Sequence, residues 1–203
     1  MSGRHLTLGQ VPERLRGKGI LEMPYHHLAF ASRNTEATDC FYREAMGFTL
    51  SKVEVGPTPT GGWSKHFFYD TGDGSMIAFW EIHDDQIPSP PTTAISTGLG
   101  LPEWVNHVAF DAPTREDLDE HRSRLIRNGY DVLEVDHGWC ISIYMQDPNG
   151  IMVEFCHSTR EFTAEEVAEA SVLLRATEPP ASSPPPSVRG FAGEGQPLHL
   201  RGA

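Results

Sequence analysis

The chain has 203 residues, with 16 Lys or Arg against 28 Asp or Glu and a formal net charge of −12. This length suits one domain or two small fused units and is enough to bury a core. The acidic balance argues against a nucleic-acid partner, and no apolar run reaches the roughly 18 residues that a membrane span needs.

Residues 1–20 carry four basic side chains and little periodicity, so we expect an N-terminal arm laid on the surface or on a neighbour. They also lack the apolar stretch of a signal peptide. Cys40, Cys140 and Cys156 are not spaced as metal ligands, which favours reduced thiols. We therefore expect a cytoplasmic protein with no membrane partner.

An internal repeat follows the arm. The strand-like stretches PYHHLAFAS and WVNHVAFDA carry a histidine at the same place, and each precedes a capped helical stretch that ends at Gly47 or Gly129. Each half then closes on a turn and a last strand, TGDGSMIAFWEI and DPNGIMVEFCH. The pattern predicts two modules of order βαβββ, at about 22–84 and 103–158, with a linker over 85–102.

The last part of the chain divides into a helix and a tail. Thr163 and Glu166 have the spacing of a capping box, and the apolar spacing that follows predicts an amphipathic C-terminal helix over 161–176. Residues 177–203 are rich in Pro, Ser and Gly, which predicts a flexible tail.

Superposing the two halves aligns His27 with His107 and Ala78 with Glu154. Taken singly, each of these polar residues reads as a hydrogen-bonded core residue. Their recurrence at equivalent positions instead favours a metal site of two imidazoles and one carboxylate, the facial triad associated with Fe(II), which leaves coordination positions open. His26 is expected to face away from this site, because side chains alternate along a strand.

These stretches resemble the vicinal oxygen chelate superfamily of glyoxalases, bleomycin-resistance proteins and dioxygenases. The resemblance covers about residues 22–158 and rests on HLAFASRNTEATDCFYREAMGF and DPNGIMVEF. It implies an α+β fold in which two tandem βαβββ modules form one open, metal-holding β-sheet cup, followed by the C-terminal helix.

Within that superfamily, VDHGWCISIYMQDPNGIMVEF resembles the signature of type I extradiol ring-cleaving dioxygenases in their small one-domain form. The resemblance implies metal ligands His27, His107 and Glu154. It also implies that His137 orients O2 and that Tyr144 acts as an acid on the substrate. Trp139, His66, Trp80 and Phe79 are further candidates to wall the substrate pocket.

The expected activity is Fe(II)-dependent cleavage of a catechol-type ring with O2, giving a semialdehyde-type product. Mn(II), Zn(II) or Ni(II) are the alternative metals. Two other functions remain open: a glyoxalase-like lyase or isomerase or a fosfomycin-type thiol transferase, and a ligand-sequestering binding protein. The expected partners are a small aromatic diol and O2, and the sequence leaves a homodimer open.

Overall fold

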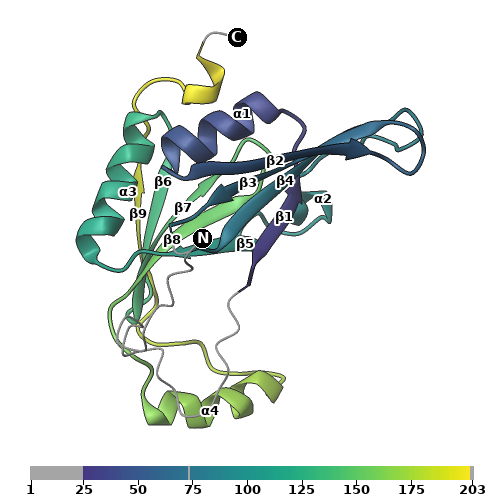
Figure 1. Cartoon of the computed structure of the whole chain (residues 1–203). Coiled ribbons are helices and arrows are strands. Elements are labelled where there is room, and N and C mark those ends of the chain that lie inside the picture. The colour runs from purple at the N-terminus through teal and green to yellow at the C-terminus, as the bar shows by residue number, and fades with distance from the viewer. Residues whose placement is uncertain (1–24, 73, 202–203) are drawn as a thin grey trace, which may run out of the picture.

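The computed structural model describes residues 25–72 and 74–201, so the arm over residues 1–20 lies outside the described part. Two βαβββ units follow one another (Figure 1). The first contains β1 (His27–Ala31), α1 (Thr35–Cys40), β2 (Thr49–Pro57), β3 (Trp63–Asp70) and β4 (Met76–His83). The second contains β5 (His107–Asp111), α3 (Arg115–Arg127), β6 (Val132–Asp136), β7 (Cys140–Gln146) and β8 (Met152–Ser158). The expected α+β fold of two such modules is confirmed.

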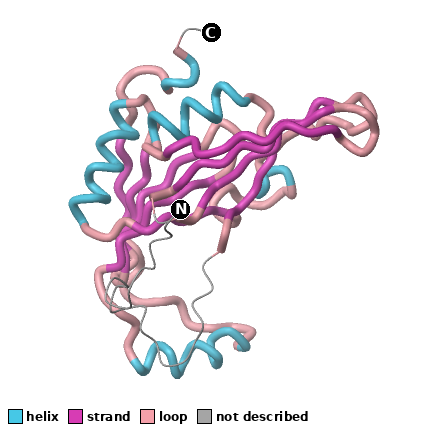
Figure 2. The backbone as a smooth tube through the Cα atoms, in the orientation of Figure 1, coloured by secondary structure: helices cyan, strands magenta, loops and turns pink. Residues whose placement is uncertain are grey.

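Each unit forms its own open sheet. The strand order is β1-β4-β3-β2 in the first sheet and β5-β8-β7-β6-β9 in the second, with β1 parallel to β4 and β5 parallel to β8. Figure 2 shows α1 and α3 along the outer side of the strands, with the β2–β3 hairpin extending away from the body. The face of each sheet opposite these helices is the candidate location of a functional site.

Capping residues start the helices where the sequence predicts. The Asn34 side chain accepts a hydrogen bond from the Ala37 amide, and Thr114 and Thr163 form capping boxes with Asp117 and Glu166. A π-helical turn, Phe41–Ala45, continues α1. Gly129 then ends the α3 segment at φ +86°, where a Cβ would lie 2.3 Å from the Gln196 carbonyl oxygen, so a side chain is excluded.

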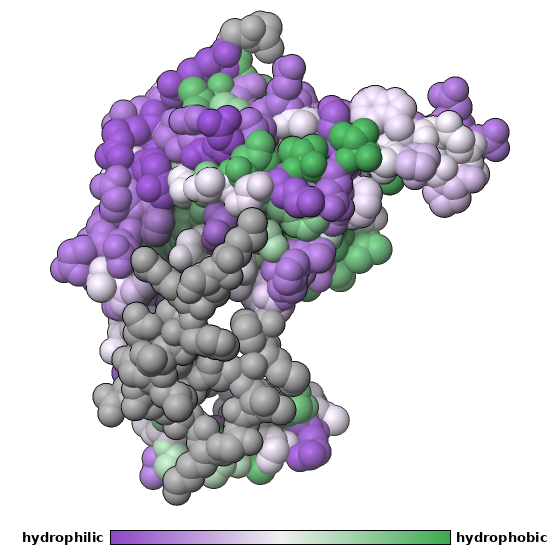
Figure 3. Space-filling model, viewed as in Figure 1, coloured by the Kyte–Doolittle hydropathy of each residue, from purple (hydrophilic) through white to green (hydrophobic). Residues whose placement is uncertain are grey.

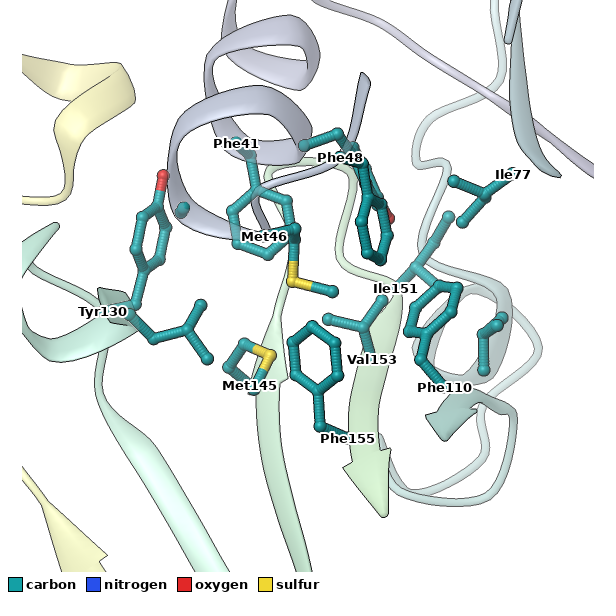
Figure 4. Close-up of a cluster of buried hydrophobic side chains, with 14 of the residues drawn as sticks. Phe41, Met46, Phe48, Ile77, Phe110, Tyr130, Met145, Ile151, Val153 and Phe155 are labelled. Carbon is teal, nitrogen blue, oxygen red and sulfur yellow. The ribbon is translucent and has the colours of Figure 1, made fainter. Parts of the chain in front are cut away.

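The two units share one hydrophobic core. Aromatic and aliphatic side chains from α1, α3 and both sheets pack together, and Figure 4 shows Met46 and Phe48 facing Phe155 and Phe110. Phe41 and Tyr130 meet edge to face with ring centroids 4.9 Å apart. This shared core holds the two sheets in one body.

The turn between β7 and β8 joins the modules by hydrogen bonds. Asp147 accepts bonds from the amides of Asn149 and Ile151, at 2.8 Å each, and from the Tyr42 hydroxyl at 3.1 Å. The Asn149 side chain donates to Thr38 Oγ1 at 3.1 Å. Much of the DPNG stretch therefore serves to dock the first helix on the second module.

The C-terminal region differs from its expectation in one respect. Helix α4 (Ala164–Arg175) forms as predicted, is exposed along its length, and lies apart from the sheets (Figure 1). Residues 177–203, expected to be a flexible tail, instead supply β9 (Ser187–Phe191), which pairs antiparallel with β6, and a 3-10 helix (Leu198–Leu200). Backbone hydrogen bonds to an edge strand can form whatever side chains the added strand carries. The amino-acid composition of residues 177–203 therefore does not reveal that part of this segment pairs with β6.

The short helix α2 (Ile95–Gly98) lies in the linker. Among the helices of residues 25–72 and 74–201, none is long and apolar enough to span a membrane. Figure 3 shows apolar side chains gathered over β2, where Leu50, Val53 and Val55 are exposed. The cysteines Cys40, Cys140 and Cys156 are free thiols, as expected.

Candidate functional site

One row of side chains crosses the face of the second sheet opposite its helix. Ala109 of β5 is paired with Glu154 of β8, Glu154 with Tyr144 of β7, and Tyr144 with Leu133 of β6. Directly paired residues point to the same face of a sheet. The expected carboxylate and tyrosine are therefore neighbours, set side by side by strand register.

His107 faces Glu154 at the edge of this row. Its Nε2 lies 3.2 Å from Glu154 Oε2, and the Glu154 side chain is only 6% exposed. His107 Nδ1 lies 3.1 Å from the Trp104 carbonyl oxygen, which can only accept, so Nδ1 carries a proton. The lone pair of Nε2 then faces the lone pairs of the Glu154 carboxylate. These two acceptors can approach each other only with a second proton or a cation between them. A metal ion fits this pair of donors.

Tyr144 and His137 lie beside the pair. The Tyr144 hydroxyl is 3.2 Å from His137 Nε2, and the Tyr144 and His107 ring centroids are 6.1 Å apart. Burial raises the pKa of Tyr144 to about 12, and the nearby Glu154 carboxylate adds to the rise. The phenol therefore keeps its proton at neutral pH and can donate a hydrogen bond.

His27 lies elsewhere, on the first sheet. Its Nδ1 is 2.8 Å from His26 Nδ1, and its ring meets those of His66 and Phe68 with centroids 5.7 and 5.3 Å apart. Within the described residues, no three His, Cys, Asp or Glu side chains form a group that could hold a metal. Two of the three expected ligands are thus together, and His27 does not join them in this arrangement.

His26 also differs from its expectation. It was expected to face away from the metal site, on the other strand face from His27, but β1 begins only at His27, so strand alternation does not govern the residue before it. The two imidazoles contact each other instead. Strand register is set within one sheet. The distance from His27 to the His107–Glu154 pair depends instead on how the two sheets pack against each other.

The expected pocket residues are dispersed. His66 and Trp80 stack at 3.9 Å between ring centroids and line a cavity of about 440 Å³ on the first sheet. Burial lowers the pKa of His66, and its buried Nε2 has no hydrogen-bond partner among residues 25–72 and 74–201. Trp139 packs against Phe162 at 4.9 Å. Phe79 is wrong as a pocket residue: it is fully buried in the core, because alternation along β4 turns it toward α1.

A groove beside Tyr144 was not expected from the sequence. Its volume is about 710 Å³, and its lining includes Leu133, Met152, Gly190 and Phe191. The strand alternation of residues 132–136 signals that Leu133 shares a face with Val135. Nothing in the sequence signals that Gly190 comes to lie next to Leu133, since that depends on the pairing of β6 with β9.

Several solved structures are similar to this chain at low sequence identity. A glyoxylase/bleomycin resistance protein/dioxygenase domain from Frankia sp. EAN1pec is 15% identical, with a TM-score of 0.52 over 68% of this chain and 99% of that one. A lactoylglutathione lyase from Agrobacterium tumefaciens is 19% identical, with a TM-score of 0.45 over 68% and 95%. TnmS3, an antibiotic binding protein from Streptomyces sp. CB03234, is 15% identical, with a TM-score of 0.45 over 69% and 99%.

A search of curated proteins returns no match. The family model described as the glyoxalase/bleomycin resistance protein/dioxygenase superfamily matches residues 25–155, which is more than half of the chain and spans both βαβββ units. The chain therefore belongs to the glyoxalase/bleomycin resistance protein/dioxygenase superfamily.

Proposed function

We propose that the chain is a metal-dependent extradiol dioxygenase that opens a catechol-type ring with O2 to a semialdehyde-type product. The observation that carries the proposal is the gathering of His107, Glu154, Tyr144 and His137 on one sheet face. They come from β5, β8, β7 and the turn before β7. A buried carboxylate, an oriented imidazole and a hydrogen-bonded phenol and histidine suit acid–base work on a bound diol.

In this proposal His107 and Glu154 hold Fe(II), with Mn(II), Zn(II) or Ni(II) as alternatives. The bound metal would supply open positions for the diol and O2 and the electron transfer between them. His27 is the third ligand, brought in by movement of the first sheet or supplied by a second copy of the chain. In the second case the active form is a homodimer.

The side chains of the site divide the remaining work. Tyr144 donates a hydrogen bond to a substrate oxygen and acts as the acid when negative charge develops on that oxygen. His137, whose Nε2 is 3.2 Å from the Tyr144 hydroxyl, positions the phenol. It also provides an N–H to orient O2.

The test is anaerobic loading with Fe(II), followed by measurement of bound iron and of oxygen uptake with a panel of catechols. We expect the His107→Ala and Glu154→Ala variants each to lose bound iron and oxygen uptake. His157→Ala is the matched control. Its Nδ1 also bonds a backbone carbonyl, that of Ala112 at 3.0 Å, but strand alternation puts it on the opposite face of β8 from Glu154. It should keep iron and activity.

Mixing His27→Ala with Glu154→Ala chains shows where the third ligand comes from. Iron binding restored by mixing would mean that the site draws on two copies, and binding that stays lost would place His27 in the same chain. Bound iron without oxygen uptake would overturn ring cleavage in favour of another metal-dependent activity of the superfamily. Tight binding of an aromatic ligand with no metal would favour a ligand-sequestering protein.

A further inference from the structure

The row of side chains that carries Glu154 and Tyr144 continues beyond the modules. Leu133 of β6 is paired with Tyr144 on one side and with Gly190 of β9 on the other. Neighbouring strands lie about 4.8 Å apart, so the row runs roughly 14 Å from Glu154 to Gly190. This length exceeds that of a single aromatic ring.

Strand β9 adds a wall that the family match does not include. The family model ends at residue 155, whereas β9 covers Ser187–Phe191 and lies outside β6 (Figure 1). With Tyr144 and Leu133, β9 borders the groove of about 710 Å³. The groove therefore begins at the proposed acid and ends on a segment added to the shared fold.

The groove is apolar inside and acidic at its rim. Leu133 is 45% exposed and lines the groove together with Met152, whose strand partner Gln146 lies on the same face as Tyr144. The polar rim groups are already paired, since Gln146 donates to Glu103 at 2.8 Å and Asp131 accepts from the Gly193 amide at 2.8 Å. Such a lining suits an apolar group and disfavours an anionic one.

Gly190 leaves the far end of the groove open. A Cβ built on Gly190 meets no atom of the described part of the chain within 4 Å, and the φ of Gly190 does not lie in the left-handed region. A side chain there would be tolerated by the backbone. Because Gly190 is paired with Leu133, that side chain would project from the same face, over the groove.

We propose that this groove is a subsite for an apolar substituent on the ring substrate, and that Gly190 sets the length of substituent that fits. The inference rests on the proposed function, since it extends a diol bound at Tyr144 along the sheet. The favoured substrates carry an alkyl or aryl group, and carboxylated ones are rejected by Glu103 and Asp131.

The experiment compares the iron-loaded wild type with Gly190→Ala and Gly190→Leu on catechols bearing hydrogen, methyl, propyl or phenyl at ring position 4. Oxygen uptake gives kcat/KM, and calorimetry under anaerobic conditions gives Kd. Gly190→Leu should lower kcat/KM for the phenyl compound by at least about tenfold and change that for catechol by less than about twofold. For the phenyl compound, the kcat/KM of Gly190→Ala should lie between those of wild type and Gly190→Leu. Arg189→Leu, one residue away on the opposite face of β9, should leave the preference unchanged.

The outcomes separate the two proposals. Turnover that does not depend on substituent length, or a Gly190→Leu variant with wild-type preference, would overturn the subsite while leaving the ring-cleaving activity in place. If no catechol is turned over but affinity rises with substituent length and falls in Gly190→Leu, the subsite stands and the ring-cleaving activity fails. Catechols that neither bind nor react would overturn both.

Discussion

Replacing Asp147 should show that the β7–β8 turn joins the two modules. Asp147 is 5% exposed and accepts four hydrogen bonds, from the Asn149 and Ile151 amides, the Tyr42 hydroxyl and the Asn149 side chain. Asp147→Ala removes the acceptor and leaves these donors buried without partners. The variant tests the turn without touching the proposed chemistry.

The expected cost follows from these contacts. Each stranded donor costs about 1 kcal/mol at the low end of the usual range, or about 4 kcal/mol for four. Burial raises the pKa of Asp147, so folding disfavours its ionised form. Removing the carboxylate therefore offsets part of the stability lost with the four hydrogen bonds. We expect Asp147→Ala to lower the free energy of unfolding by roughly 2–4 kcal/mol, a large share of a typical domain's 5–15 kcal/mol.

Urea unfolding followed by tryptophan fluorescence and circular dichroism measures this cost. Asp136→Ala is the matched control, because Asp136 also accepts an amide two residues on, from Gly138 at 2.8 Å, but is exposed. It should cost less than about 1 kcal/mol, since water replaces the lost acceptor. An Asp147→Ala protein no less stable than Asp136→Ala would refute the account of the turn.

The pH dependence gives a second readout. A carboxyl whose pKa is raised by folding stabilises the protein fully below its unfolded pKa, and this contribution is lost as the pH rises through the folded pKa. The stability of wild type relative to Asp147→Asn should therefore decrease as the pH is raised through that interval. An advantage that instead grows with pH would contradict the sign.

Three further predictions concern the site, the tail and a buried histidine. Tyr144→Phe should lower kcat for catechol cleavage by about 10²–10⁴-fold with little change in the urea midpoint; equal rates would exclude Tyr144 as the acid. Deleting residues 183–203 should lower the free energy of unfolding by at least about 2 kcal/mol, since β9 and the partly buried Phe191 are lost; an unchanged melting temperature would contradict this. Burial and Arg124 lower the pKa of His121 from 6.5 to about 4, so stability should fall as pH drops from about 6.5 to about 4, and His121→Phe should flatten that part of the profile measured by thermal unfolding.

The elements were predictable because their signals are local. Asn34, Thr114 and Thr163 cap helices through contacts within three residues, and the repeat of HLAF as HVAF marks equivalent strands. The grouping of Glu154 with Tyr144 was also predictable, since both lie on one hairpin whose register follows from its turn.

The rest of the site could not be read from the chain because it depends on contacts distant in sequence. The position of His27 relative to His107 depends on how two separate sheets pack, and strand patterns do not encode that angle. The place of Gly190 depends on pairing between strands whose ends are about 50 residues apart, through a segment whose composition is typical of disorder. Phe79 was misjudged because an aromatic residue suits a core as well as a pocket.

Asn149 joins the β7–β8 turn to the first module and to the linker. Its side chain meets the Arg33 amide just past the end of β1, and its carbonyl accepts from Thr93 in the linker. The opposite end of β1 is His27, and every residue of β1, His27 included, is paired with β4. A movement that brings His27 to His107 therefore has to carry β4 together with β1, because the two strands are paired from end to end.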